Sequence, residues 1–331
     1  MDTFVILIQY TILYAIPLMI VALGGLFSER SGIINLALEG EMIFGAFIGA
    51  LVTKLIIAAN PQLATSQWLL ILGVIISGLS GGAFSLLLSF SAIRAKADQT
   101  IGGTALNLLA PAIVCTFGLI LFNSEKVITG ARFVIISSQY SEAMQNAMFN
   151  SWFGPILRIM FDRLYLTTYI VIFLFIALSI WLYKSKTGTH IRACGEHPSA
   201  CDSVGINVVK MRYLGTTIGG ALAGIGGYAY IVACCAATAE SSVAGLGFFA
   251  LAIMIFGNWN PILIALGALL FGFLKCIGVL SSQISFLSTL NLPMYFYNII
   301  PYFIVLVVLM LSKRKSGVPK AEGIPYDKGA R

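Results

Sequence analysis

Charged residues are scarce in this chain of 331 residues. Only 10% are Asp, Glu, Lys or Arg, whereas 59% are apolar and the mean hydropathy is +0.94. A soluble domain carries about 25% charged residues and places them on its surface. This chain has too few charges to cover a globule in water, which excludes soluble enzymes, nucleic-acid-binding modules and secreted disulfide scaffolds. The composition therefore predicts an all-α, polytopic membrane protein.

Motifs for catalysis and metal binding are also missing. The chain has no Gly-Lys dipeptide and hence no phosphate-binding loop, and it has no H-E-x-x-H. Cys194, His197 and Cys201 offer three zinc ligands without a convincing fourth, whereas a structural site needs four. The six cysteines fall mostly in apolar runs or in a loop that we place in the cytoplasm below, where thiols stay reduced. We expect no enzyme activity, no metal site, no disulfide and no cofactor bound by this chain.

Long apolar runs dominate what is present. The first, from Phe4 to Phe27, has no charge and is long enough to cross about 30 Å of hydrocarbon. Further runs follow at 33–59, 67–93, 101–123, 164–183, 213–236, 247–257, 261–282 and 295–312. They predict a bundle of about nine spans with broken or re-entrant helices. Eight to ten spans stay open, because 247–257 is short and Ser28–Glu41 could re-enter without crossing.

The distribution of charge predicts the orientation. Residues 184–212 carry a net charge of +3 and residues 313–331 carry +4, whereas the forty residues 124–163 carry only +1. Because cytoplasmic loops are enriched in Lys and Arg, the first two segments are predicted to be cytoplasmic and the third to lie outside. The chain is thus divided into a transmembrane domain, 1–312, and a basic cytoplasmic tail, 313–331. An interfacial helix is expected at about Ser141–Phe149.

Glycine and proline positions predict close packing and helix irregularities. Gly-x-x-x-Gly motifs allow two helices to approach closely, and prolines inside apolar runs kink or break a helix. The motifs are Gly45/Gly49, Gly78/Gly82 and Gly220/Gly224, and the prolines are Pro17, Pro111 and Pro301.

Polar residues gather between positions 28 and 41. Asn35 and Glu39 are four residues apart and would share one face of a helix, and Ser31 would extend that face. A carboxylate near hydrocarbon is costly unless it faces a partner or a wet cavity. Two interpretations stay open for this face: it lines a solute path, or it is a structural hydrogen-bond clamp. A second cluster, which starts at Thr100 and ends in Asn107, has the same two interpretations.

Residues 187–207 form a polar loop of a different kind. Pro198 favours the start of a short helix over 199–204, and Gly205 bounds it.

Four stretches resemble a known family, the membrane permease subunits of bacterial ATP-binding-cassette (ABC) importers of the ribose and branched-chain amino acid type, and within it the nucleoside branch. They are LFSERSGIINLALEGEMIFGAF, IGGTALNLLAP, TGTHIRACGEHPSACDSVGINVVKMRYLGTTIGGALAGIGG and GLGFFALAIMIFGNWNPILIALGALLFG. The resemblance implies a place in the bacterial cytoplasmic membrane and a separate ATPase subunit that binds ATP. It also implies an external substrate-binding lipoprotein and a second, related permease subunit. The membrane lipid is a further partner, and no nucleic acid is expected.

The resemblance also implies roles for single residues. In such a family the third stretch is the cytoplasmic coupling loop, which makes Gly195, Glu196, Pro198 and Gly205 candidates for docking the ATPase. The solute would pass between the two permease subunits, and the candidates for its path are Ser31, Asn35, Glu39 and Asn107. Riboflavin, sugars and branched-chain amino acids are alternative solutes. An ion-coupled secondary transporter is the rival from another class, because Glu39 could be a titrating acid within the membrane.

Overall fold

The computed structural model describes residues 2–134, 164–281, 294–311 and 317–327. The predicted outside loop lies largely beyond these ranges, and the interfacial helix expected at Ser141–Phe149 lies wholly beyond them. The helices are α1 (Asp2–Arg30), α2 (Leu38–Ala59), α3 (Gln67–Ser89), α4 (Gln99–Phe122), α7 (Leu166–Lys184), α8 (Lys186–Glu196), α9 (Pro198–Ser203), α10 (Val208–Cys234), α11 (Leu246–Phe256), α12 (Pro261–Leu280) and α14 (Met294–Leu311). Short helical turns, η1 (Pro61–Thr65) and η2 (Phe90–Arg94), flank α3.

The prediction of an all-α membrane bundle is confirmed. Seven helices of the described chain are long and apolar enough to cross a membrane, and the predicted runs 247–257 and 295–312 form α11 and α14. The strands that the structure describes are two residues each, β1 (Val127–Ile128) and β2 (Thr238–Ala239), which pair antiparallel. Pro17, Pro111 and Pro301, at which kinks or breaks were expected, all lie inside continuous helices, so none of them breaks its helix.

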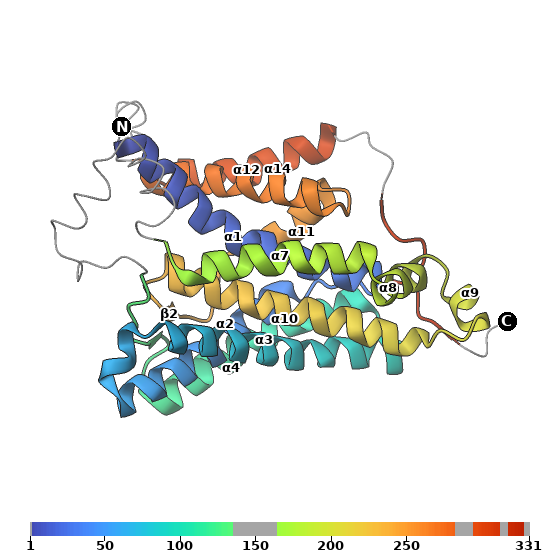
Figure 1. The fold of residues 1–331 in the computed structure, drawn as a ribbon, viewed down its shortest axis with the longest axis horizontal. Coiled ribbons are helices and arrows are strands. Elements are labelled where there is room, and N and C mark those ends of the chain that lie inside the picture. Colours follow the sequence, from blue (N-terminus) through green and yellow to red (C-terminus); the bar gives the residue numbers. More distant parts are fainter. Residues whose placement is uncertain (1, 135–163, 282–293, 312–316, 328–331) are drawn as a thin grey trace.

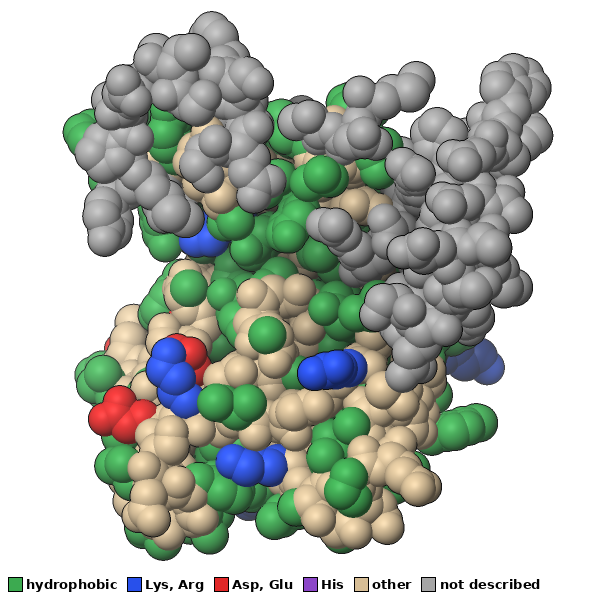
Figure 2. Space-filling view, turned by 90° about the vertical axis from the view of Figure 1, so that its left-hand side faces the viewer, with side chains coloured by type: hydrophobic (Ala, Val, Ile, Leu, Met, Phe, Trp, Pro, Cys, Tyr) green, Lys and Arg blue, Asp and Glu red, His purple; other side chains and the backbone are tan. Residues whose placement is uncertain are grey.

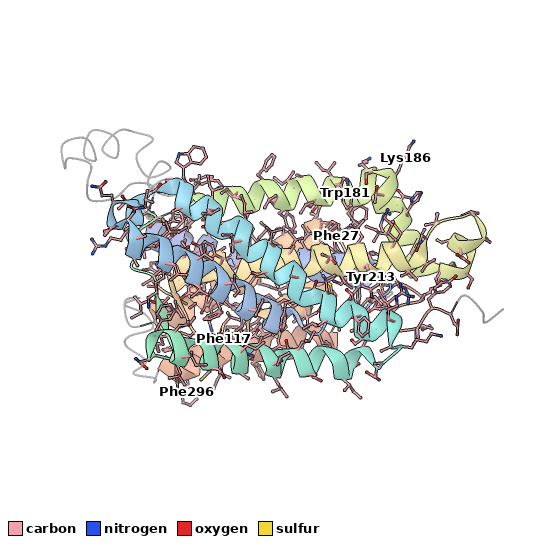
Figure 3. All side chains as sticks on the ribbon, turned by 90° about the horizontal axis from the view of Figure 1, so that it is seen from below. Phe27, Phe117, Trp181, Lys186, Tyr213 and Phe296 are labelled. Carbon is pink, nitrogen blue, oxygen red and sulfur yellow. The ribbon has the colours of Figure 1, made fainter. Side chains whose placement is uncertain are left out.

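Long helices run along the bundle side by side, with α12 and α14 grouped near α1 (Figure 1). On α1, Phe27 stacks on Trp181 of α7, with ring centroids 5.9 Å apart (Figure 3). The chain reverses direction between successive helices, which places its two ends at opposite ends of the bundle.

The two ends of the bundle carry different segments. Helices α8 and α9 and the C-terminal residues share one end (Figure 1), and Lys96 before α4 joins them there through a 2.6 Å contact between its Nζ and Asp327 Oδ2. The β1–β2 ribbon lies at the other end, where Lys126 and Glu240 form an ion pair at 2.7 Å. Figure 2 views that end and shows acidic and basic side chains on its surface. The segments predicted to share the cytoplasmic side therefore do lie together.

The three glycine motifs pack against one another at the centre of the fold. A Cβ on Gly45 of α2 would overlap Gly224 of α10, and a Cβ on Gly220 of α10 would overlap Ser85 of α3. A Cβ on Gly78 of α3 would lie 3.0 Å from a side-chain carbon of Ile225. The predicted close packing is confirmed, and the three motifs serve a single interface among α2, α3 and α10.

Candidate functional site

The connection between α1 and α2 lies inside the protein. Ser31 and Asn35 are fully buried there, and Gly32 has a φ of +95°, which favours glycine. Ser31 Oγ donates to Ser28 O at 2.6 Å. Asn35 Nδ2 donates to both carboxylate oxygens of Glu41, at 3.1 and 3.2 Å, and Asn35 Oδ1 accepts from Ala37 N at 3.0 Å.

The predicted polar helix face is wrong. Helix α2 begins at Leu38, so Asn35 precedes it and does not share a helical face with Glu39. The turn at Gly32 and the burial of the connection reposition Asn35, whose amide binds Glu41 and satisfies a buried carboxylate that would otherwise be costly. Ser31 and Asn35 therefore form hydrogen bonds within the chain.

Asn107 joins α4 to this connection. Its Nδ2 donates to Leu36 O at 2.7 Å, and its Oδ1 accepts from Gly40 N at 2.8 Å. The two backbones approach so closely that a Cβ on Gly40 would lie 2.7 Å from Leu106 O. Asn107 thus satisfies backbone groups that the helix start at α2 and the irregular connection leave without helical partners.

Glu39 caps α11. Gly245 N donates to Glu39 Oε1 at 2.9 Å, and Gly247 N donates to Oε2 at 2.6 Å. Because α11 has 11 residues, it rises about 16 Å, roughly half the thickness of the hydrocarbon. Its first turn packs on the start of α2, because Gly247 lies against the backbone of Glu39. The carboxylate satisfies two N–H groups that have no partner within the helix, and it matches the positive end of the helix dipole.

The cap is buried apart from a small exposed surface on Glu39. Glu39 retains 8% of its surface, whereas Ser31 and Asn35 retain none. Tyr302 of α14 is 46% exposed and its ring lies 4.4 Å from that of Phe249 on α11. The sequence analysis missed this aromatic pair, because nothing in the sequence places α14 beside the start of α11.

The polar loop folds as expected. Helix α9 begins at Pro198 and ends at Ser203, and Gly205 follows it with a φ of +84°. Before it, Ser185 Oγ caps α8 by accepting from Gly188 N at 2.9 Å. Cys194 and Cys201 are buried together, and burial, followed by the proximity of Cys201, raises the pKa of the Cys194 thiol to about 12. Among the described residues, no three His, Cys, Asp or Glu side chains are grouped to hold a metal ion.

The four docking candidates differ in accessibility. Gly195 is buried, because it packs against the backbone of Arg30. Glu196 points to the same residue, with Oε1 3.9 Å from Arg30 Nη1. Pro198 is partly accessible and Gly205 is exposed. The sequence analysis missed Val204, an apolar side chain 73% exposed at the tip of the loop, although its apolar character in a polar loop is visible in the sequence.

The comparisons with known proteins decide the family. A family model described as the permease component of the branched-chain amino acid transport system matches residues 7–310. The chain belongs to this permease family. It is 34% identical to the guanosine ABC transporter permease NupQ of Bacillus subtilis, over 98% of each chain. It is 33% identical to the nucleoside ABC transporter permease NupC of Lactococcus lactis, over 99% of this chain and 98% of that one.

A third relative of the permease is more distant. The nucleoside ABC transporter permease NupB of Lactococcus lactis is 23% identical over 78% of this chain and 68% of its own. No solved structure matches the permease. The family agrees with the bundle of apolar helices and with the absence of a phosphate-binding loop from the sequence.

Proposed function

We propose that this permease forms the membrane path of an ABC importer for nucleosides, powered by an ATPase on a separate subunit. The near full-length similarity to permeases for guanosine and nucleosides carries the proposal. An external binding lipoprotein would deliver the solute, and a second, related permease would form the other side of the path. Closure of the ATPase dimer would shift the two permeases between outward-open and inward-open states, because the closed dimer binds these two states with different affinity.

The experiment that tests this function is reconstitution in vesicles. The permease, its companion permease, the ATPase and the binding protein should take up a radiolabelled nucleoside only when ATP is present on the ATPase side. An excess of unlabelled nucleoside should compete, whereas riboflavin, a sugar or a branched-chain amino acid should not. Uptake that is driven by an ion gradient without the ATPase would contradict the proposal and favour a secondary transporter.

We propose that the end of the bundle with α8 and α9 faces the bacterial cytoplasm, as does the C-terminus. The net charges of +3 and +4 on residues 184–212 and 313–331 support this orientation. In a cysteine-free background, Glu125→Cys at the β1 end should react with an impermeant maleimide in intact cells. Ser199→Cys on α9 should react only after the membrane is opened. Both positions are exposed to solvent in the structure. Labelling of Ser199→Cys in intact cells would therefore contradict the proposed orientation.

We propose that α9 docks in a groove of the ATPase through its exposed tip. The accessible residues there are Pro198, Val204 and Gly205. Gly195 and Glu196 would contribute indirectly, by holding α8 against α1. Val204→Asp should reduce the amount of ATPase that co-purifies by about tenfold, because an apolar anchor at the centre of an interface can be worth more than about 1 kcal/mol. Val204→Thr keeps the shape and is the control. Equal co-purification of both variants would exclude Val204 from the docking surface.

We propose that the solute path passes the small exposed surface of Glu39 at the start of α11. Its residual exposure beside the exposed ring of Tyr302 supports this, because nucleosides offer a flat base to stack and hydroxyls to hydrogen-bond. Ser31, Asn35 and Asn107, the other path candidates, would shape the path by fixing the connection between α1 and α2.

A further inference from the structure

The C-terminal residues 317–327 do not form a free tail. They run along the end of the bundle that carries α8 and α9 (Figure 1). Their backbone N–H groups donate to three different parts of the fold, and Asp327 pairs with Lys96 before α4. The N–H bonds are Gly317 N to Asn258 Oδ1 at 2.6 Å, Ala321 N to Gly195 O at 2.9 Å and Gly323 N to Gly32 O at 3.2 Å. We call residues 317–327 the C-terminal strap.

Arg212 anchors the strap from below with a buried side chain. The side chain belongs to α10, is only 1% exposed and donates from Nη1 to Ile324 O at 3.0 Å and from Nη2 to Ala321 O at 3.5 Å. In the described part of the chain Arg212 forms no ion pair. A buried guanidinium without acceptors is strongly unfavourable, so the two strap carbonyls replace the water that Arg212 gave up on folding.

The strap also closes a polar network at the end of α1. Trp259 Nε1 donates to Glu29 Oε2 at 2.6 Å, Arg30 Nη2 donates to Trp259 O at 3.1 Å, and Arg30 faces Glu196 of α8. Glu322 of the strap lies beside this network, where burial raises the pKa of its carboxyl to about 7 while Arg30 acts in the opposite direction. The last residue of α1, the turn after α11 and the end of α8 thus meet under the strap.

The position of the strap matters because α8 and α9 are the helices that meet the ATPase in the proposed function. Gly195 lies in the last turn of α8, before α9, and its carbonyl accepts a hydrogen bond from Ala321 N. Arg212 lies in the second turn of α10, the helix that follows α9. The strap therefore holds both flanks of α9, and through Gly32 it also holds the start of the buried connection that leads to the Asn35–Glu41 pair.

We propose that the C-terminal strap transmits the movement of α8 and α9 to α1 and α10, with Arg212 as its positioning residue. This inference rests on the proposed function, because it needs an ATPase that moves α9. Without the strap, α9 would still offer its docking tip and α8 would still touch α1 at Arg30. The links from α8 to Gly32 and Arg212 through the strap would be lost, so less of the movement would reach the connection between α1 and α2. The expected defect is a joint loss of solute-stimulated ATP hydrolysis and of uptake, with docking retained.

The first test is a pair of truncations in the complete reconstituted importer. Removal of residues 317–331 should leave ATPase co-purification unchanged and lower both solute-stimulated hydrolysis and uptake by about fivefold or more, the size of a moderate coupling between sites. Removal of residues 328–331 takes away two positive charges but keeps the strap, and should leave both rates unchanged. Wild-type rates of hydrolysis and uptake in the longer truncation would overturn the inference.

Point variants decide the matter if the longer truncation fails to assemble. Gly323→Val should loosen the strap, because Gly323 has a φ of +74° and a Cβ there would lie 2.9 Å from Ile34 Cδ1. Arg212→Gln should lower hydrolysis and uptake more than Arg212→Lys, since a lysine still offers a charged donor to the two carbonyls. Coupled transport at the wild-type rate in both Gly323→Val and Arg212→Gln would overturn the strap inference alone. Wild-type uptake without any ATPase would instead overturn the proposed function.

Discussion

Gly81→Val should almost abolish the assembled permease in the membrane. Gly81 of α3 faces α10, and a Cβ there would overlap Gly220 O and lie 2.9 Å from Gly224 Cα. The obstacle is backbone on both sides, which no change of rotamer can relieve, so the helices must separate. Overpacking a tight interface costs about 3 kcal/mol, and in a bilayer the lost contacts are those that drive helix association.

The measurement for Gly81→Val is the amount of monodisperse protein recovered in mild detergent, together with its thermal unfolding. Ala83→Val is the matched control, because Ala83 lies two residues further along α3 on an exposed face and the change introduces the same valine side chain. Equal recovery and equal stability of the two variants would contradict the close approach of α3 and α10 at Gly81.

Glu39→Ala should lower nucleoside uptake per assembled complex by about tenfold or more. The change removes the acceptors of the buried Gly247 N–H and of the part-buried Gly245 N–H, and an unsatisfied buried donor costs about 1–3 kcal/mol. The first turn of α11 should then fray beside the proposed path. Glu39→Gln keeps one acceptor oxygen and the side-chain volume, so its loss should be intermediate.

Uptake and the amount of complex are measured on the same membranes, so that transport is expressed per complex. Glu240→Ala is the control, because it also removes a glutamate carboxylate. Glu240 forms an exposed ion pair with Lys126, and such a pair contributes little to stability. A parallel fall of uptake and complex in Glu39→Ala would mean that the cap serves stability alone. A complete loss in Glu39→Gln with normal assembly would instead favour an ion-coupled carrier that uses this acid.

Local sequence information was sufficient for several features. The start of α9 follows from Pro198, whose fixed φ suits the first turn, and its end follows from Gly205, which adopts a positive φ. The span positions follow from length and hydropathy, and the glycine motifs follow from their spacing. Each of these depends on a few neighbouring residues, which is why they could be predicted without knowledge of the fold.

Partners between distant segments could not be predicted in this way. The spacing of Asn35 and Glu39 predicts one helix face for both. The turn at Gly32 delays the start of α2, so Asn35 precedes the helix and donates a hydrogen bond to Glu41. Glu39 in turn binds residues that follow it by more than two hundred positions. A carboxylate in an apolar run predicts that a partner exists, because an unpaired one is too costly, but it does not identify that partner.

Composition and spacing were enough to predict that the chain is a bundle of apolar helices, that residues 184–212 and 313–331 carry a net positive charge, and which glycines pack closely. The packed helices were needed to show that Gly195 and Glu196 face α1, that α11 starts on the carboxylate of Glu39, and that residues 317–327 bind Arg212. The physical reason is that hydropathy and turn geometry are local, whereas the satisfaction of a buried polar group is a global condition. Each buried donor or acceptor takes whichever partner the packed helices bring to it.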